Sequence, residues 1–445
     1  MDGYYAWMIV ATALVLMMTT PALALFYGGM SRSKSVLNMM MMSYVALAVV
    51  GIVFVLWGWS MGWGADGLGN ANGKLIANPF TMFGLDGVSH GNYIYVLFQL
   101  TFAAITAALI SGSIADRVKL SSWVLFVIGW VTLAYFPIAH NVWGGGWLYT
   151  KFPNLDYAGG TVVHINAGIA GGVLALIIGK RVGWPKEPMR PHNLTLTMIG
   201  AGLLWFGWYG FNVGSIVFTA DSLKDPVAFS TQFYSETGVT FMNTTLATMA
   251  AMLGWLLVER FLHGKATTLG AASGVVAGLV AITPSCGSVS LVGAIIIGAL
   301  AGGVCAVAVG MKFKLGLDDS LDVVGVHLVG GTLGALAIGF LGTDKSPQGV
   351  DGLFGDMNGL FYGGDLTLLG HQAMGVLFTL VVSGVVTLVL GLAIKYTIGW
   401  RIPAEDEVEG IDFVLHGETA YDLGTSTSRF GKVGATDVIK EGANA

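Results

Sequence analysis

The stretch "GGTVVHINAGIAGG", residues 159–172, has the small and apolar residues of a membrane-spanning helix, yet it contains one imidazole, His164. Ionisable residues are costly inside a membrane, and those that occur there usually mark a pathway or pair with one another. A second stretch, "DVVGVHLVGGTLG" at residues 322–334, carries His327 in the matching place. The two histidines are therefore the leading candidates for a functional site within the membrane.

The composition of the chain supports a membrane location for both stretches. Its 445 residues are 54% hydrophobic and 11% charged, with a mean hydropathy of +0.73, whereas soluble proteins carry about 25% charged residues. The N-terminus lacks the basic region of a signal peptide. We therefore expect an all-α polytopic membrane protein with eleven spans, near residues 5–29, 40–63, 93–115, 121–139, 159–180, 194–217, 238–258, 267–284, 290–311, 322–342 and 368–396.

Basic residues between these runs predict the topology. One set of loops contains most of them, at Arg32, Lys34, Arg117, Lys119, the segment 180–190, Arg260, Lys265, Lys312 and Lys314. The alternate loops contain only Lys74, Lys151, Lys224 and Lys345. The positive-inside rule makes the first set cytoplasmic, which places the N-terminus outside and the C-terminus in the cytoplasm.

The polar C-terminal part predicts a second region. We expect a transmembrane domain over residues 1–398 and a cytoplasmic tail over residues 399–445. The first part of the tail has enough hydrophobic residues to dock on another surface. The last twenty or so residues have a composition typical of disorder.

Two short echoes suggest an internal repeat. "LFYGG" (residues 25–29) ends the first run and "GWYGFNVG" (residues 207–214) ends the sixth, while the histidine stretches open the fifth and tenth runs. Two halves of five spans each would begin on opposite sides of the membrane, which is the signature of an inverted repeat. Such a repeat would bring His164 and His327 together near mid-depth.

The expected chemistry of this histidine pair follows from its burial. An environment without water disfavours the imidazolium, and a neighbouring imidazolium would disfavour it further. A neutral pair that shares one hydrogen bond offers both a donor and an acceptor, which suits ammonia or water and allows proton relay. The alternative is that each histidine is only a hydrogen-bonded packing residue.

Aromatic residues at helical spacing form a second candidate site. Phe98 and Phe102 are four residues apart in the third run, and Phe211 and Ser215 are four apart in the sixth, so each pair shares a helix face. Together with Trp143 they would attract a cation, which could donate a hydrogen bond to Ser215. Taken singly, the phenylalanines are more typical of a core, and Trp143 of an interfacial anchor.

Acidic residues precede both histidine stretches. Asp156 lies eight residues before His164, where it would cap the helix or make the outer vestibule attractive to a cation. We expect Asp322, five residues before His327, to be its counterpart, with Asp318 and Asp319 as further capping residues. The two cysteines, Cys286 and Cys305, fit a structural role, and their spacing does not suggest a metal site.

Longer motifs resemble a known family. "FQLTFAAITAALISGSIADR", "IAHNVWGGGWL", "DYAGGTVVHINAGIAGG" and "GWYGFNVGS" are similar to the bacterial Amt branch of the Amt/Mep/Rh ammonium transporters. The resemblance covers the chain from the first run to "HGETAYD" in the tail. It implies eleven helices with a five-plus-five inverted repeat, and a homotrimer in the cell membrane with one pore per subunit.

The resemblance also implies a role for each candidate residue in the uptake of ammonium, for which methylammonium would be an analogue. The external ammonium site would consist of Trp143, Phe98, Phe102 and Ser215, with Asp156 nearby. The pore gate would be Phe102 and Phe211, and the pore histidines would be His164 and His327. The resemblance implies no enzyme activity, cofactor, metal or nucleic acid, and it implies a cytoplasmic PII signalling protein as a partner of the tail.

Several alternatives remain open from the sequence. A gas channel of the Rh type would pass ammonia without binding ammonium. A haem-binding oxidoreductase would use His164 and His327 as axial ligands. An ammonium sensor would scarcely transport at all, and the residues do not decide between electrogenic and electroneutral transport.

Overall fold

The computed structural model describes residues 2–64, 73–187, 189–347 and 358–421, and within these ranges the chain is helical, with two isolated β-bridges and no strand. Ten helical segments in the described ranges are long and apolar enough to cross a membrane. A further apolar helix, α12 (Thr268–Ile282), has 15 residues and occupies the place of the predicted span at 267–284. The all-helical membrane fold predicted from the sequence is therefore confirmed.

Several spans consist of helices joined by π-helical or 3₁₀ turns. The first half contains α1 (Asp2–Met17), η1 (Met18–Leu23), α2 (Ala24–Met30), α3 (Val36–Val53), η2 (Phe54–Gly58), α4 (Trp59–Gly62), η3 (Phe83–Leu85), η4 (His90–Asn92), α5 (Tyr93–Ile110), η5 (Ser111–Ile114), α6 (Leu120–Trp130), η6 (Val131–Tyr135), α7 (Phe136–Val142), α8 (Trp147–Lys151), η7 (Gly160–Ile165) and α9 (Asn166–Ile178). The second half contains α10 (Leu194–Val213), α11 (Pro226–His263), α12, α13 (Leu291–Leu315), η8 (Val324–Leu328), α14 (Val329–Leu341), η9 (Leu360–Tyr362), α16 (Leu366–Thr397), α17 (Ala404–Glu409) and α18 (Ile411–His416).

Polar side chains set the starts of the second-half helices. Asn193, Asp225, Thr267 and Ser290 each accept a hydrogen bond from a backbone N–H in the first turn of α10, α11, α12 and α13. Such caps satisfy donors that have no partner inside the helix. The loops of this half therefore carry the residues that begin its helices.

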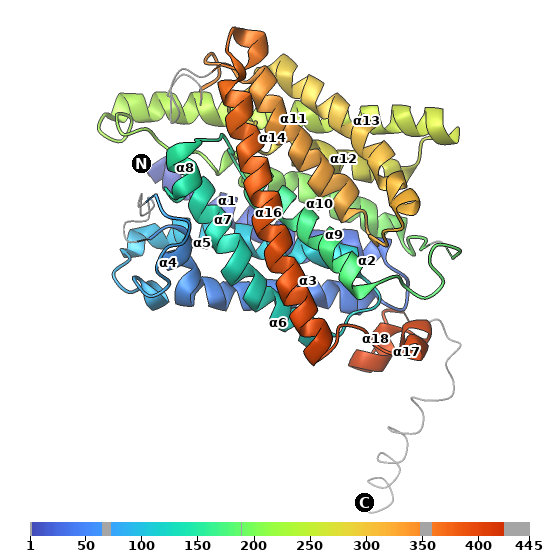
Figure 1. Cartoon of the computed structure of the whole chain (residues 1–445). Coiled ribbons are helices and arrows are strands. Elements are labelled where there is room, and N and C mark those ends of the chain that lie inside the picture. Colours follow the sequence, from blue (N-terminus) through green and yellow to red (C-terminus); the bar gives the residue numbers. More distant parts are fainter. Residues whose placement is uncertain (1, 65–72, 188, 348–357, 422–445) are drawn as a thin grey trace, which may run out of the picture.

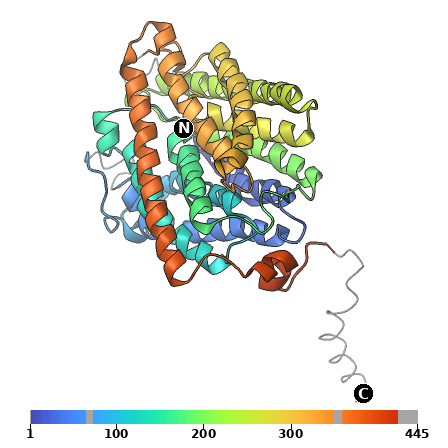
Figure 2. The same cartoon turned by 45° about the vertical axis from the view of Figure 1, so that its right-hand side comes forward.

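The helices form a bundle with α16 lying obliquely across its outside (Figures 1 and 2). Helix α16 packs on α9 and α14, α11 packs on α12 and α13, and α1 packs on α10. At the centre, η7 and α9 contact η8 and α14. The two stretches that contain the histidines are thus buried neighbours.

The N-terminus and the tail lie at opposite ends of the bundle (Figure 1). The predicted basic loops gather at the tail's end, since Val118 forms a β-bridge with Arg401, Lys34 Nζ donates to the Val408 carbonyl, and His192 Nε2 lies 2.9 Å from the Tyr421 hydroxyl. We call this end the inner end and the opposite end the outer end, following the orientation that the charges predict.

The two histidine stretches carry matching glycines where they contact each other. Gly168 and Gly331 have the same spacing in sequence as His164 and His327. A Cβ atom on Gly168 would lie 2.5 Å from the Leu328 nitrogen, and one on Gly331 would lie 3.0 Å from the His164 Cβ. Each half therefore supplies a glycine that allows the histidine-containing stretch of the other half to pack closely against it.

The tail is folded as far as Tyr421. Its α18 docks on the start of α3, where the Asp412 carboxylate accepts hydrogen bonds from the Leu37 and Asn38 backbone nitrogens at 2.9 and 2.8 Å. Its α17 places Glu407 on the Val182 nitrogen at 2.8 Å. The final segment that was predicted to be disordered falls outside the described residues.

Candidate functional site

The two histidines meet in the centre of the bundle. His164 lies in η7 and His327 lies in η8, and their Nδ1 atoms are 3.3 Å apart. Their side chains are almost completely buried, with 1% and 4% of the residue surface exposed. One Nδ1 must carry a proton and the other must accept it, so the arrangement fits a neutral pair joined by one hydrogen bond.

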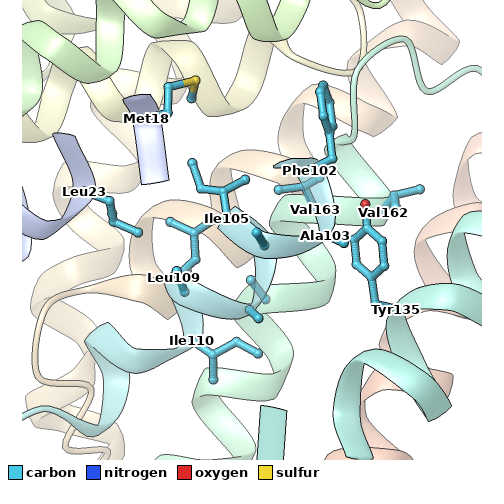
Figure 3. Close-up of a cluster of buried hydrophobic side chains, with 14 of the residues drawn as sticks. Met18, Leu23, Phe102, Ala103, Ile105, Leu109, Ile110, Tyr135, Val162 and Val163 are labelled. Atoms are coloured by element: carbon cyan, nitrogen blue, oxygen red, sulfur yellow. The ribbon is translucent and has the colours of Figure 1, made fainter. Parts of the chain in front are cut away.

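The pair borders a small cavity of about 10 Å³, which is close to the space that a single water molecule needs. Apart from the two imidazoles its walls are apolar, and Figure 3 shows part of them, with Met18 and Leu23 lying across from Ile105 and Leu109. His164 Nε2 is buried without a hydrogen-bond partner among the described residues. A water-sized polar molecule could therefore bind at this nitrogen.

A pair of stacked rings separates the histidines from the outer end. The centroids of Phe102 and Phe211 are 3.9 Å apart and the ring planes differ by 14°. Phe211 in turn lies 6.2 Å from the His164 ring. Both phenyl rings are buried, and Phe211 also lines the cavity beside the histidines.

The predicted outer site lies directly on this ring pair. The Phe98 and Phe102 centroids are 4.8 Å apart, and Trp143 meets Phe102 edge-on at 6.2 Å. The Ser215 hydroxyl donates to the Phe211 carbonyl at 2.8 Å, which leaves its oxygen lone pairs free to accept a bond from a cation. The structure thus brings the aromatic residues together, and Gly214, which precedes Ser215, lies so close to the Phe98 ring that a Cβ there would be 2.8 Å away.

Trp143 is held in place by the loop that precedes η7. Its indole nitrogen donates to the Asp156 carbonyl at 2.8 Å. It is only half-buried, because its ring lines the outer side of the phenyl pair. Its position is therefore fixed by the loop around Asp156 as well as by its own helix.

The Asp156 carboxylate forms the cap of η7. It accepts hydrogen bonds from the backbone nitrogens of Gly159, Gly160, Thr161 and Val162, and from the Thr161 hydroxyl. Burial raises the pKa of Asp156 above its usual value, while these hydrogen bonds oppose the rise by favouring the ionised form. The geometry shows the capping role.

Asp319, rather than Asp322, is the counterpart of Asp156. Asp319 lies eight residues before His327 and accepts hydrogen bonds from the Val323 and Val324 nitrogens at 3.1 and 2.8 Å. Asp322 instead has a positive φ of 63° and forms an ion pair with Lys312 at 2.5 Å. The expectation for Asp322 was wrong because its backbone turns its carboxylate away from η8.

One neighbour of the histidines was not predicted from the sequence. The Trp208 ring stacks on His164 at 5.4 Å with an interplanar angle of 24°, and its indole nitrogen donates to the Thr283 hydroxyl at 2.8 Å. Trp208 lies three residues before Phe211, a spacing that puts both on one face of α10. This three-residue spacing is the sequence feature from which the position of Trp208 could have been predicted.

The close contact of the histidines also bears on the haem alternative. With the Nδ1 atoms 3.3 Å apart, no space remains between the rings for a porphyrin. Three or more His, Cys, Asp or Glu side chains in a metal-binding arrangement do not occur among the described residues.

The sequence profile of the Ammonium Transporter Family matches residues 6–421. The chain belongs to this family. A protein named ammonium transporter in Mycobacterium bovis is 51% identical over 96% of this chain and 91% of its own length. One of the same name in Aquifex aeolicus is 45% identical over 95% of this chain and 94% of its own length.

Solved structures agree with this assignment. Candida albicans Mep2 is 31% identical, with a TM-score of 0.81 over 96% of this chain and 93% of its own. A structure described as a sensor Amt protein is 25% identical, with a TM-score of 0.80 over 93% of this chain and 98% of its own. This family member is thus a multi-pass plasma membrane protein, and its relatives are transporters rather than enzymes.

Proposed function

We propose that this protein takes up ammonium across the cell membrane, by binding it outside, removing its proton and passing ammonia between the two halves of the fold. The observation that carries the proposal is the pair of histidines, with Nδ1 atoms 3.3 Å apart, on a small apolar cavity beneath stacked phenyl rings. The relatives named ammonium transporters support the choice of substrate.

Recruitment uses the outer aromatic site. A cation over the faces of Trp143 and Phe98 gains from the negative charge on the ring faces, by about 0.5–2 kcal/mol per interaction. Ser215 accepts one hydrogen bond from ammonium, and the buried charge of Asp156 makes the vestibule attractive to a cation. These interactions therefore replace part of the hydration that ammonium loses when it binds.

Deprotonation makes passage possible. The cavity walls are apolar except for the histidines, so a charged guest would lose its hydration without compensation. Ammonia crosses this region by donating to or accepting from the imidazole nitrogens, while the Phe102–Phe211 pair opens for each passage. Potassium has no proton to release, so it cannot cross as a neutral species.

The released proton follows a route separate from that of ammonia. The paired imidazoles form a donor–acceptor chain that can pass a proton from one ring to the other. One positive charge then enters for each ammonium ion taken up. Without this relay the pore would carry ammonia alone and would be electrically silent.

The functional unit in this proposal is a homotrimer that binds a PII signalling protein. Helices such as α11 and α16 expose large apolar side chains, including Phe261, Leu253 and Val389, which lipid or a second copy of the chain would cover. We assign the family's homotrimer and its PII partner on the likeness to the Amt branch. The folded tail at the inner end would form part of the PII surface.

Uptake by purified protein in liposomes tests the proposal. Ammonium and methylammonium should compete for one saturable pathway, and potassium should neither pass nor compete. Transport of ammonia that does not saturate and is insensitive to methylammonium would instead favour a gas channel of the Rh type. Absence of any flux would favour the sensor.

A further inference from the structure

A buried carboxylate lies outside the parts of the pore described so far. Glu236 is on α11, in the third turn from its outer end, and only 2% of its surface is exposed. Its Oε2 accepts a hydrogen bond from Gln232 Nε2 at 2.9 Å. Acidic residues are rarely buried in membrane spans unless they serve a pathway or a network.

One contact of Glu236 leads to the segment after Ser215. Gln232 Nε2 also donates to the Val217 carbonyl at 3.1 Å, and Gln232 Oε1 accepts from the Thr219 nitrogen at 3.2 Å. The Gln232 amide is thereby satisfied at both ends. Glu236 fixes the orientation of this amide, because a carboxylate can only accept and must face the Nε2 side.

Another contact of Glu236 leads to the loop that holds Trp143. Tyr157 directly follows Asp156 in this loop. The Tyr157 ring packs closely on Gly287, so that a Cβ atom on Gly287 would lie 2.4 Å from the ring. The Tyr157 hydroxyl is 3.4 Å from the Thr240 hydroxyl. Burial, together with the charge and hydrogen bonding of Glu236, raises the pKa of Tyr157 well above its usual value. The phenol therefore stays protonated and can donate to the carboxylate.

These contacts link the two walls of the outer site through one side chain. Glu236 is connected to the loop whose Asp156 carbonyl holds the Trp143 indole, because the Thr240 hydroxyl donates to the Glu236 carbonyl at 2.7 Å and lies 3.4 Å from the Tyr157 hydroxyl. The Glu236 carboxylate is also a hydrogen-bond partner of the Tyr157 side chain. Through Gln232 it is connected to Val217, two residues beyond Ser215. Trp143 and Ser215 are the cation-facing residues of the proposed recruitment site, and they follow the ends of different helices, α7 and α10.

We propose that Glu236 is a positioning residue of the outer site, which sets the separation of Trp143 and Ser215 and thereby the affinity for ammonium. This inference rests on the proposed function. Glu236 does not touch ammonium; it acts through Gln232 and Tyr157. The pore beyond the phenyl pair has no part in this network, so the rate at saturation depends on other residues.

Three variants test the assignment in purified protein reconstituted into liposomes. Glu236→Gln keeps the shape of the side chain but replaces one acceptor oxygen with an NH2 group, which can only donate. Tyr157→Phe keeps the ring and removes only the hydroxyl. Glu259→Gln is the matched control, because Glu259 lies on the inner end of the same helix and accepts from Thr267.

Half-saturation for ammonium and maximal uptake are measured for each variant, together with the melting temperature in detergent. We expect Glu236→Gln to raise half-saturation about fivefold, which corresponds to roughly 1 kcal/mol, with maximal uptake within about twofold of wild type. Tyr157→Phe should do the same to a smaller extent, and the double variant should show less than the sum of the two effects. Glu259→Gln should leave half-saturation unchanged.

Two results would overturn the assignment. Unchanged half-saturation in both Glu236→Gln and Tyr157→Phe would show that the network does not reach the site. A loss of maximal uptake and melting temperature with half-saturation unchanged would show that Glu236 only supports the fold. Failure of the wild type itself to take up ammonium would contradict the proposed function instead, so the two ideas fail separately.

Discussion

The contacts of the His164 side chain come from segments far away in the sequence. Its partner His327 comes from the other half of the fold, Trp208 stacks on its ring from α10, and Gly331 leaves room for its Cβ. None of these contacts is local in sequence. The chemistry of the imidazole is therefore a property of the packed bundle rather than of the stretch that contains it.

Trp143 provides a direct test of recruitment. Replacing it with Leu removes the ring face that would attract a cation, an interaction worth about 0.5–2 kcal/mol. Half-saturation for ammonium should rise by about 2- to 30-fold, while the Phe102–Phe211 pair remains. Uptake measured over a range of ammonium concentrations gives this value.

Trp147→Leu is the control for that experiment, because Trp147 also lies at the outer end but packs on Phe152 and Phe378 rather than on the phenyl pair. It should leave half-saturation unaltered. If Trp143→Leu behaves like the control, Trp143 is an interfacial anchor and recruitment must lie elsewhere.

Where spacing or repetition is visible, the sequence alone predicted which candidate residues would lie together. Phe98, Phe102, Phe211 and Ser215 share helix faces, and the echo between the halves predicted that the two histidines would meet. Asp322 was assigned wrongly because a positive φ and the Lys312 ion pair are tertiary features. Glu236 was missed because only the folded chain brings Tyr157 to it, although the four-residue spacing to Gln232 was visible.

The spans that carry the histidines depend on close helix contact. Gly168 of α9 lies against the Leu328 backbone, next to His327, and a Cβ atom there would be 2.5 Å from the Leu328 nitrogen. Backbone atoms cannot move aside as a flexible side chain can. The span boundaries were predictable from hydropathy, whereas this contact was not, because Gly is frequent throughout the chain (66 residues).

Gly168→Ala should therefore push η8 away and lengthen the distance between the histidines. Overpacking of this kind costs about 1–3 kcal/mol, so the melting temperature should fall together with ammonium flux. Gly202→Ala on α10 is the matched control, since a Cβ there meets no atom within 4 Å. Equal melting temperatures and fluxes for the two variants would show that the crossing of α9 and η8 is looser than described.

The connections at the inner end are held by a buried ion pair. Arg181 donates to the Asp318 carboxylate at 2.6 Å, and both side chains are buried. Burial alone would raise the pKa of Asp318, but the hydrogen bonds from Arg181 and the charges of Arg117 and Arg181 bring it below its usual value. A lowered pKa means that this carboxylate stabilises the fold above about pH 4 and that its contribution disappears as the pH falls further.

Asp318→Asn should lower the stability at pH 7 by about 3–5 kcal/mol, because it leaves the Arg181 charge buried without its partner. The difference in melting temperature between the variant and wild type should narrow as the pH is lowered towards about 3.5. Thermal unfolding in detergent over this pH range measures both quantities. A difference that stays constant with pH would contradict the ion-pair account.

The bundle and its tail form one connected unit at the inner end. Glu407 of α17 accepts hydrogen bonds from the Val182 nitrogen at 2.8 Å and from Arg401 at 2.6 Å, and it lies 3.8 Å from Arg32. It thereby joins the tail to two loops of the transmembrane region. The sequence predicted that the tail would dock, but it did not show which loops receive it.

Glu407→Gln should loosen the tail without altering the pore. Hydrogen bonds to charged groups contribute about 1.5–3 kcal/mol, so opening of the tail should become at least about tenfold more frequent. Hydrogen exchange of the backbone in residues 404–416 reports this opening. The exposed Glu405 on the same helix provides the control variant Glu405→Gln, and equal exchange in the two variants would argue against the proposed anchor.

The central claim is that ammonium loses its proton and crosses as ammonia past the histidine pair, with the proton following through the imidazoles. The most direct test is the current across proteoliposomes on a solid-supported membrane after a pulse of ammonium or of potassium, in wild type and His164→Ala. We predict a current for ammonium alone, which His164→Ala abolishes while the protein remains folded. A current in His164→Ala with wild-type size and selectivity would contradict the claim.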